Sequence, residues 1–348
     1  MAGRDRSYGG PTTTAWGNLH AQIHQWARRT GWLPKNGGLL VGVSGGQDSL
    51  CLLKLLVDLQ SKWHWSLVVA HCDHRWRADS RENATFVQTL CDRMQLPCEV
   101  VRAEEIPTSE AAARQWRYQV FTSLADVHHC QRIVTGHTAT DRAETLLYNL
   151  MRGSGADGLQ ALGWSRPVSP QRPDILLIRP LLGVTRQETG AFCQTYDIPT
   201  WDDRTNCDRT YARNRIRLDL MPYIAANFNP SVERTLAQTA ELLTAEVDYL
   251  EHVAAEIYQS AVNLQAGTVQ IQRRALGTVH LAIQRRVLRR ALQAITAGEI
   301  TFDHVEKLVA LIHAPNRSQS DPFPGGAIAQ VRGDWIAIGG SRNGEQPN

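Results

Sequence analysis

The stretch LLVGVSGGQDSLCLLKLL, residues 39–56, sets small residues and one acid between two apolar runs. Ser44, Gly45 and Gly46 can turn sharply and bring bare backbone N–H groups close to a ligand. A helix that begins after them adds its own unpaired N–H groups and the positive end of its dipole, so the turn can bind phosphate. Asp48 would repel phosphate unless a divalent cation bridges the two, and Mg²⁺ prefers oxygen ligands. The local chemistry predicts a phosphate and Mg²⁺ site and leaves open a plain glycine turn with a helix-capping Ser or Asp.

The turn does not match the commonest nucleotide-binding motifs. It lacks the Gly-Lys-Ser ending of a Walker-type loop, and it lacks the G-x-G-x-x-G spacing of a dinucleotide site. Neither of these two motifs therefore describes the turn.

Two further groups of polar residues follow predicted strands. VVAHCDHRWR contains the first group, and VTGHTATDRAET contains the second at spacings of i, i+4 and i+7. This spacing lets an imidazole and two carboxylates converge on one cation or amine. Hydrogen-bonded structural histidines and acids that favour a helix dipole remain the alternatives. The two groups are His71, Asp73 and His74, and His137, Asp141 and Glu144.

Arginines are concentrated in three segments. In EAAARQWRY, Glu110, Arg114 and Arg117 share a helical face, for which a surface salt-bridge ladder is the alternative. WDDRTNCDRTYARNRIR interleaves arginines with an aromatic residue, which suits an RNA backbone with an unstacked base, or a solvated loop. A predicted C-terminal helix carries a third group that would make salt-sensitive phosphate contacts. The last two groups are Arg204, Arg209, Arg213, Arg215 and Arg217, and Arg285, Arg286, Arg289 and Arg290.

Strand and helix patterns alternate through the first two thirds of the chain. Apolar runs predict strands at residues 39–43, 67–70, 99–101, 133–135 and 175–178. Helices are predicted at 80–94, 110–127 and 143–151, and another is predicted to begin at a capping box formed by Thr185 and Glu188. This alternation predicts an α/β fold with a parallel sheet and helices on both faces. Ligands bind beyond the carboxyl ends of such strands, where residues 44–49, 71–74 and 135–141 would meet.

The pattern changes after residue 228. Three helical patterns and two short strand-like runs, at residues 328–331 and 335–338, predict a smaller, mainly helical C-terminal domain. We expect a leader with a short helix at 1–36, a catalytic domain at 37–228, the C-terminal domain at 229–340 and a tail at 341–348.

Composition narrows the class of protein. The seven cysteines are scattered without a C-x-x-C pair, which argues for reduced thiols and against a cysteine-built metal or cluster site. No stretch resembles a membrane span or a signal peptide, so we expect a cytoplasmic protein without a membrane partner. The net charge of +3 is too small to indicate a nucleic-acid-binding protein by itself. A homodimer is left open.

SGGQDS at residues 44–49 resembles the S-G-G-x-D-S signature of pyrophosphatase-loop enzymes, which cleave ATP between the α and β phosphates. Over nearly its whole length the sequence resembles tRNA(Ile)-lysidine synthases, in their shorter form with one C-terminal domain. MRGSGADGLQAL, RPLLGVTRQE and DDRTNCDRTYARNRIR are the segments most specific to that family. The resemblance implies the adenine nucleotide alpha-hydrolase-like form of the Rossmann-type fold.

The family resemblance implies a two-step reaction on an isoleucine tRNA with a CAU anticodon. The C2 oxygen of the wobble cytidine would attack the α phosphate of ATP, giving an adenylated cytidine and pyrophosphate. The side-chain amine of free L-lysine would then attack C2 and expel AMP. Because that amine has a pKa of ~10.4 in water, a nearby base would have to accept its proton.

The resemblance also implies roles for individual residues. ATP and Mg²⁺ would lie at the turn, with Asp48 as the metal ligand and His71 and His137 near the nucleotide. Arg117 would lie near the transferred phosphate, and Asp141 and Glu144 would serve the lysine amine. The implied nucleotide-binding residues are Ser44, Gly45, Gly46, Gln47, Asp48, Ser49, His71 and His137. The implied catalytic residues are Asp48, Arg117, Asp141 and Glu144. The implied tRNA-binding residues are Arg213, Arg215, Arg285, Arg286, Arg289 and Arg290.

One motif departs from the family pattern. The family usually has Gly-His-His-x-Asp-Asp-Gln, whereas Thr138, Thr140 and Arg142 replace the second His, the first Asp and the Gln here. The change removes a carboxylate and adds a positive charge, which leaves the division of roles between Asp141 and Glu144 undecided.

Two other functions are weighed against this one. A tRNA thiolase with the same nucleotide fold would rely on paired cysteines in its cytidine-modifying branch, and this chain has no C-x-x-C pair. A nucleotide-dependent RNA-binding protein without turnover would not release AMP and pyrophosphate. Release that depends on both lysine and tRNA distinguishes the three functions.

Overall fold

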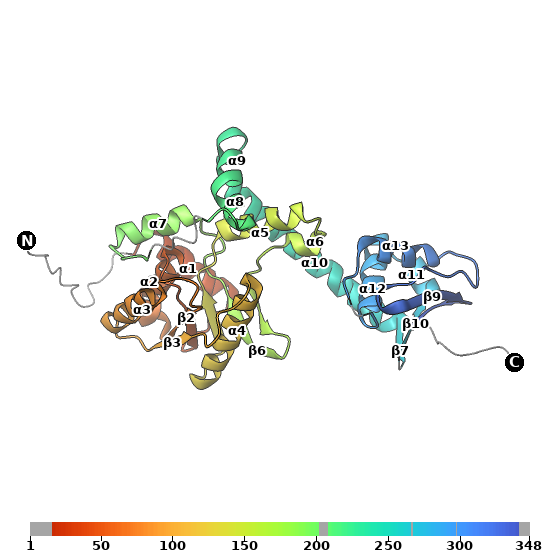
Figure 1. Cartoon of the computed structure of the whole chain (residues 1–348), viewed down its shortest axis with the longest axis horizontal. Helices are drawn as coiled ribbons and strands as arrows, with labels where there is room; N and C mark the ends of the chain where they lie inside the picture. The colour runs from red at the N-terminus through yellow and green to blue at the C-terminus, as the bar shows by residue number, and fades with distance from the viewer. Residues whose placement is uncertain (1–15, 202–207, 266, 297, 341–348) are drawn as a thin grey trace, which may run out of the picture. The chain divides into compact units, whose positions relative to one another are not determined.

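The computed structural model describes residues 16–201, 208–265, 267–296 and 298–340. The chain divides into two compact units, Met1–Leu243 and Thr244–Asn348, and Figure 1 labels many of their elements. None of the helices in the described ranges combines the length and hydrophobicity that a membrane crossing requires.

The first unit is built on a six-stranded sheet with the order β3-β2-β1-β4-β6-β5. Neighbouring strands are parallel except at one edge, where β5 runs antiparallel to β6. The strands are β1 (Gly38–Gly42), β2 (Ser66–Asp73), β3 (Cys98–Arg102), β4 (Arg132–Thr135), β5 (Ser165–Ser169) and β6 (Arg172–Ile178). The predicted parallel sheet is confirmed, and β5 is an addition that the sequence did not indicate.

Alternate residues of β1 pack into two different cores. Leu39 and Val41 lie in one apolar cluster with residues of α1, α2, α3 and α7. Leu40 lies in another with Phe121 and Ala125 of α4. Because successive strand side chains point to opposite faces, helices cover both faces of the sheet, as predicted. The helical segments of this unit are α1 (Asn18–Thr30), α2 (Gln47–Trp63), α3 (Ser80–Arg93), α4 (Glu110–Val127), α5 (Ala139–Met151), α6 (Ala156–Leu159), α7 (Arg186–Thr195), α8 (Ala212–Arg215), the π-helical η2 (Ile216–Leu220) and α9 (Met221–Asn227).

Two capping boxes place helices that matter for the site. Thr185 and Glu188 cap α7 as predicted, through the Glu188 carboxylate and the Thr185 hydroxyl. Thr138 and Asp141 form a second box, so α5 begins at Ala139 rather than at the predicted residue 143. A reciprocal box satisfies two N–H groups that a helix otherwise leaves unpaired, which explains the earlier start.

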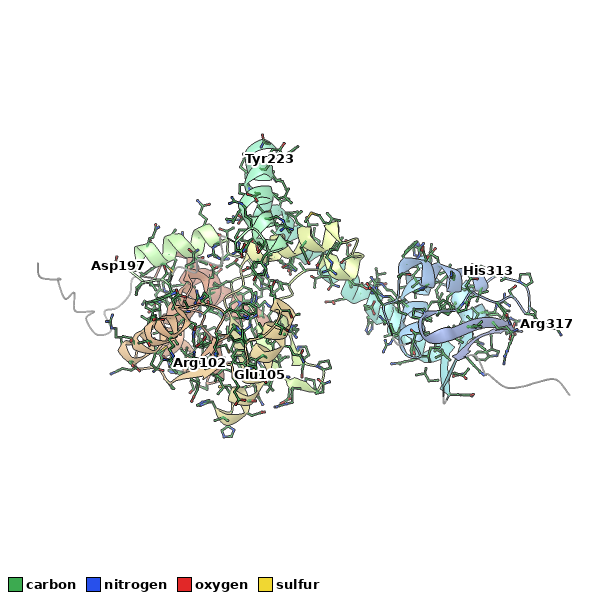
Figure 2. All side chains as sticks on the ribbon, in the orientation of Figure 1. Arg102, Glu105, Asp197, Tyr223, His313 and Arg317 are labelled. Carbon is green, nitrogen blue, oxygen red and sulfur yellow. The ribbon has the colours of Figure 1, made fainter. Side chains whose placement is uncertain are left out.

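The carboxyl ends of the parallel strands meet at one edge of the sheet. There Arg102, the last residue of β3, lies 3.4 Å from the carboxylate of Asp73, the last residue of β2. Figure 2 marks Arg102 and, in the loop that follows, Glu105. At this same edge the glycine turn follows β1 and His137 follows β4. His71 and Asp73, which were predicted to follow a strand, are among the last residues of β2.

The second unit has more sheet than predicted. Its antiparallel sheet has the order β7-β8-β10-β9, and only β9 and β10 were predicted. Val269 and Ile271 of β8 are buried and their neighbours half-buried, a short alternation that is easily overlooked between helices. The segments are β7 (Val262–Gln265), β8 (Thr268–Gln272), α11 (Arg273–Gly277), α12 (Leu281–Gln293), α13 (Phe302–Leu311), the turn η3 (Pro324–Gly326), β9 (Ala327–Arg332) and β10 (Trp335–Gly340).

The division between the units falls inside the long helix α10 (Val232–Ala261), between Leu243 and Thr244. The sequence had indicated residue 228. The start of α10 belongs to the first unit because Val232 and Leu236 pack with Ala143 of α5. A change of local pattern marks where the helix begins, whereas packing decides which unit its first turns join.

Candidate active site

The glycine turn after β1 is shaped for close approach of a ligand. Gly45 has φ +89°, a conformation that side-chain-bearing residues rarely adopt, and a Cβ there would overlap the amide oxygen of Asn83. The Asn83 amide donates to the Ser44 carbonyl oxygen at 3.1 Å. The Ser49 hydroxyl donates to the Gly46 carbonyl at 2.9 Å and accepts from the Ser44 N–H at 3.2 Å. The turn is thus held in shape while the first N–H groups of α2 have no partner within the helix.

Asp48 sits at the N-terminal end of α2 and contacts α7. Its Oδ2 accepts from the Arg186 guanidinium at 2.9 Å, and its Oδ1 accepts from the Thr189 hydroxyl. Burial raises the pKa of Asp48 above its ordinary value, against the opposing effects of Arg186 and Thr189, while Asp141 raises it further. The carboxylate is 15% exposed and so remains within reach of a ligand at the turn.

The loop between β4 and α5 packs directly on the start of α2. A Cβ added at Gly136 would lie 2.8 Å from the backbone oxygen of Asp48 and 2.9 Å from the Cα of Ser49. Glycine is needed here because two backbones approach each other closely. This contact brings the residues that follow β4 next to the glycine turn at residues 44–49.

Asp141 and Glu144, here called the acidic pair, face two arginines. Arg217 grips Glu144 with two hydrogen bonds of 2.6 and 2.9 Å, and Arg213 reaches it at 3.2 Å. Asp141 Oδ1 accepts from Arg213 at 3.3 Å and from Arg217 at 3.4 Å. Its other oxygen, Oδ2, accepts from the Thr138 N–H at 2.8 Å in the helix cap.

Charge and burial act in opposite directions on the acidic pair. Glu144 is fully buried. Burial would raise the pKa of Asp141, but His137, Arg213 and the Thr138 N–H more than offset it, so that pKa lies below its usual range. The pair is therefore a site for cations that is already filled by guanidinium groups of the same chain.

The three family departures have structural partners. Thr138 caps α5. Thr140 accepts from the Arg186 N–H at 3.0 Å and donates to Glu233 at the start of α10. Arg142 is buried and bonds to Glu241, which also accepts from the indole of Trp164 at 2.7 Å. The added positive charge of Arg142 is thus paired with Glu241.

The two predicted nucleotide histidines are held differently. His71 is buried, and its Nδ1 donates to the Val43 carbonyl oxygen at 2.8 Å, so only Nε2 is left for other partners. Burial lowers the pKa of His71. His137 is half-buried and shares a hydrogen bond of 3.0 Å with the Thr135 hydroxyl through Nδ1. Burial lowers the pKa of His137 as well, and nearby arginines add to this effect, so both rings are neutral near pH 7.

Arg117 belongs to a group of cations around one ring. The guanidinium carbons of Arg114, Arg117 and Arg166 lie 5.1, 5.9 and 4.9 Å from the centre of the Tyr118 ring. Arg114 and Arg117 come from α4 and Arg166 from β5. No ion pair joins either α4 arginine to an acid within the ranges that the structure describes. This leaves their charges available to an anion, and among the described residues these arginines do not form the salt-bridge ladder with Glu110 that was the alternative interpretation.

The predicted tRNA-binding arginines fall into separate groups. Arg213 is turned to the acidic pair, whereas Arg215 donates to the carbonyl oxygens of Arg209 and Thr210, both at 2.9 Å. Part of the second motif, residues 202–207 with Arg204, lies outside the described residues.

The α12 arginine cluster, residues Arg285, Arg286, Arg289 and Arg290, is partly neutralised within the second unit. Arg285 bonds to Glu306 at 2.7 and 3.1 Å, and Arg286 bonds to Glu251. Arg290 lies 4.8 Å from the ring centre of Tyr258 and is exposed, like Arg289. The acids that pair with Arg286 and Arg285 come from α10 and α13, respectively.

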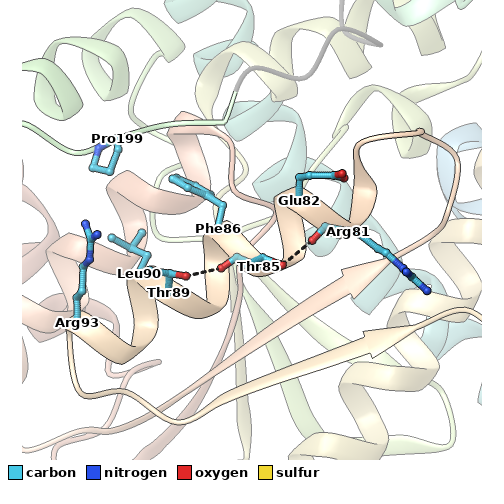
Figure 3. A pocket seen from close by; sticks show the side chains of 8 residues that line it. All are labelled: Arg81, Glu82, Thr85, Phe86, Thr89, Leu90, Arg93 and Pro199. Carbon is cyan, nitrogen blue, oxygen red and sulfur yellow. Dashed lines mark hydrogen bonds between the residues drawn. The ribbon is translucent and has the colours of Figure 1, made fainter. Parts of the chain in front are cut away.

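A hollow of about 530 Å³ lies along α3, apart from all predicted site residues (Figure 3). The side chains of Phe86, Leu90 and Pro199 supply its apolar wall. Thr85 and Thr89 bond their hydroxyls to helix carbonyls one turn earlier. The remaining lining residues are Arg81, Glu82 and Arg93. The hollow is therefore lined by none of the acids or glycines on which the chemistry above depends.

Two residues of the site, Arg186 and Thr189, were not predicted as functional, and Arg217 was predicted only within the arginine group suited to RNA. Arg186 and Thr189 hold Asp48, and Arg217 holds Glu144. Arg186 stood within RPLLGVTRQE and Arg217 four residues after Arg213, so the motifs contained them. What they contact depends on how α7 and η2 pack.

Two protein-family models match this chain. The family model described as "PP-loop domain" matches residues 18–224, and the one described as "TilS substrate binding domain" matches residues 272–334. The chain is 54% identical over 343 residues to the tRNA(Ile)-lysidine synthase of Nostoc sp. (strain PCC 7120), covering 95% of this chain and 98% of the relative. It is 49% identical to that of Synechocystis sp. (strain PCC 6803), covering 92% and 98%.

Among solved structures, the chain is similar to the U34-tRNA thiolase NcsA from Methanococcus maripaludis with its [4Fe-4S] cluster. The TM-score is 0.53 and the sequence identity 16%, with 65% of this chain and 78% of that chain covered. A likeness at this identity concerns the fold, which agrees with the parallel sheet described above.

Proposed function

The chain belongs to the tRNA(Ile)-lysidine synthase family, and from this premise we propose that it joins L-lysine to C2 of the wobble cytidine in an isoleucine tRNA with a CAU anticodon. It is accordingly an ATP-dependent ligase. The single observation that carries the proposal is the packing of the loop after β4 onto the start of α2. Through that contact, the glycine turn at residues 44–49 and the acidic pair lie at one edge of the sheet.

Residues 44–49 are proposed to hold the ATP phosphates. The positive φ of Gly45 and the fixed carbonyls of the turn leave the first N–H groups of α2 to bind phosphate oxygens. Asp48 fits Mg²⁺ because it offers hard oxygen atoms at a partly exposed position, and Mg²⁺ commonly takes only one or two carboxylates plus substrate phosphates. A bound Mg²⁺ would neutralise charge on the triphosphate.

The first step is attack of the cytosine C2 oxygen on the α phosphate. A new P–O bond forms, the bond between the α and β phosphates breaks, and pyrophosphate leaves. We assign Arg117 to the negative charge on the transferred phosphate, since its guanidinium has no acid partner among the described residues. His71 and His137, both neutral, would serve as hydrogen-bonding groups for the nucleotide rather than as cations.

The second step is attack of the lysine ε-amine on C2 with loss of AMP. The ammonium group binds the acidic pair, which must then accept one proton to release the nucleophilic amine. Asp141 is fixed by the cap through Oδ2 and presents Oδ1, whereas both oxygens of Glu144 face arginines. Asp141 and Glu144 therefore act together as a cation site, and the fixed orientation of Asp141 sets its position.

Arg213 and Arg215 are proposed to contact the tRNA near the cytidine, and the α12 arginine cluster to contact tRNA phosphates elsewhere. The cluster lies within the part of the chain matched as a substrate binding domain. Because Arg289 and Arg290 are exposed whereas Arg285 and Arg286 are half-buried, we expect Arg289 and Arg290 to contribute most. We place the enzyme in the cytoplasm, with tRNA and free lysine.

The test measures AMP and pyrophosphate release from ATP by the full chain. Release should require the CAU isoleucine tRNA, lysine should be incorporated, and nucleoside analysis of the product should show lysidine. Sulfur incorporation from a persulfide donor would identify a thiolase instead. Tight tRNA binding without ATP cleavage would leave only the RNA-binding alternative.

A further inference from the structure

The acidic pair is bound by two guanidinium groups in a geometry that a substrate cation would otherwise occupy. Arg217 forms a fork on Glu144 at 2.6 and 2.9 Å, and Arg213 bridges both acids at 3.2 and 3.3 Å. Asp141 offers only Oδ1 to any cation, because Oδ2 belongs to the helix cap. A lysine ammonium group would need the same oxygens.

The charges of this cluster already balance. Two carboxylates face two guanidinium groups, so a third cation would gain little attraction unless a guanidinium withdrew. Glu144 is fully buried, and removing its partners without replacement would leave a carboxylate in a low-dielectric site at high cost. One cation must therefore replace another, and the acids stay paired throughout.

The two arginines come from a segment suited to rearrangement. Arg213 lies on α8, which has a single turn, and Arg217 lies on the π-helical η2. Such π-helical turns are rare and occur frequently at functional sites. The side chain of Arg213 is 34% exposed and that of Arg217 is 18% exposed, so an incoming polyanion can reach Arg213 first.

A phosphodiester is the natural competitor for these guanidinium groups. Arg binds phosphate and carboxylate oxygens with the same planar fork of donors. The tRNA supplies phosphates and L-lysine does not. A tRNA that engages Arg213 and Arg217 would leave both acids without partners at the moment when an ammonium group is required.

We propose that Arg213 and Arg217 are internal substitutes for the lysine substrate, which hold the acidic pair until tRNA phosphates draw them away and free L-lysine takes their place. This inference rests on the proposed function. It makes lysine binding conditional on bound tRNA, so the amine enters only after the cytidine is in the site. By thermodynamic linkage, lysine must strengthen tRNA binding by the same factor.

The experiment is equilibrium dialysis of radiolabelled L-lysine against the full chain, with a non-cleavable ATP analogue and with or without the CAU isoleucine tRNA. We expect tRNA to tighten lysine binding by about 5–150-fold, the range of ordinary coupling between sites. Arg217→Met and Arg213→Gln should tighten lysine binding in the absence of tRNA and reduce the coupling factor. Arg217→Lys, which keeps the charge, should keep the coupling.

Arg172→Gln is the matched control, since Arg172 likewise bridges two carboxylates, those of Asp126 and Asp174, but lies on β6 and has no assigned role in the chemistry. It should leave tRNA-free lysine affinity unchanged. If thermal unfolding shows that Arg217→Met does not fold, the lysine affinity of Arg213→Gln is the deciding measurement. In that variant the buried Glu144 still has Arg217 as its partner. Equal lysine affinity with and without tRNA, or weaker tRNA-free binding in both arginine variants, would overturn the proposal.

Two different results separate the failure of the cation exchange from the failure of the proposed function. If the wild-type chain makes lysidine but shows no coupling, the exchange of cations is wrong and the function stands. If the wild-type chain forms no lysidine from tRNA, ATP and lysine, the proposed function itself is wrong.

Discussion

Replacing Asp48 with asparagine should separate catalysis from stability. The change keeps the size of the side chain and removes its charge. The proposed Mg²⁺ ligand and the ion pair to Arg186, 2.9 Å long, are lost together. The carboxylate is 15% and the guanidinium 35% exposed, so the ion pair is worth at most about 1 kcal/mol.

Burial of the Asp48 carboxylate destabilises its charged form and so opposes the stabilising effect of the ion pair with Arg186. Because burial raises the pKa of Asp48, ionising this group costs the folded state free energy at neutral pH. A neutral amide in its place would not carry that cost, so Asp48→Asn should leave the unfolding free energy unchanged or slightly increased, within about 1 kcal/mol. For a unit of this size, that corresponds to a shift in Tm of about 2–4 °C at most. Linkage sets the pH dependence. The stability that the asparagine variant gains over the wild type is present above the folded pKa of Asp48 and is lost as the pH falls through the ordinary range of aspartate.

Adenylation should respond much more strongly. Losing one well-placed electrostatic group in an active site typically slows the chemical step by about 10²–10³-fold. We expect this loss in AMP and pyrophosphate formation from ATP, with the Kd for tRNA unchanged in filter binding. Asp58→Asn is a useful comparison, because Asp58 lies on the same helix but bonds to His20 and Lys54. It should lower the Tm and leave adenylation intact.

Three results would refute this reasoning. Substantial adenylation by Asp48→Asn would remove the metal role, and a large loss of tRNA binding would place Asp48 in the RNA interface. A fall in Tm of more than about 4 °C would show that the contacts to α7, rather than the cost of burial, dominate the stability effect.

Further outcomes concern the turn, the cap region and the C-terminal unit. Gly45→Ala should destabilise the fold by about 1–2 kcal/mol and raise the KM for ATP, since φ is +89° and the new methyl group overlaps Asn83; an unchanged KM would contradict the proposed phosphate role. Arg142→Gln should reduce the unfolding free energy by about 1–3 kcal/mol, and so lower the Tm, because the bond to Glu241 is lost. Lysidine formation should be kept, and a large rise in the KM for lysine would contradict the structural role. Neutralising the whole α12 arginine cluster should weaken tRNA binding and flatten its salt dependence. The exposed Arg289 and Arg290 half should do so more than the half-buried Arg285 and Arg286 half, which a salt slope measured for each double variant would test.

Local signals in the sequence determined most of the catalytic fold. Strand positions were readable because buried parallel strands are continuous apolar runs. The Thr185–Glu188 box was readable because a cap needs only residues three apart. The glycine turn was readable from its own composition, and the rule that ligands bind at strand ends then placed the candidate residues on one edge.

Tertiary packing alone decided which groups meet there. Asp48 and Arg186 are 138 residues apart, and Glu144 and Arg217 are 73 apart. No periodicity or cap encodes such distances in sequence, because the contacts depend on how α7, η2 and α5 are stacked. The same holds for Arg142, which could have added charge to the site but is buried against Glu241. Residue spacing set the chemistry available to this protein, whereas the packing of its helices determined which acid is already paired and with which cation.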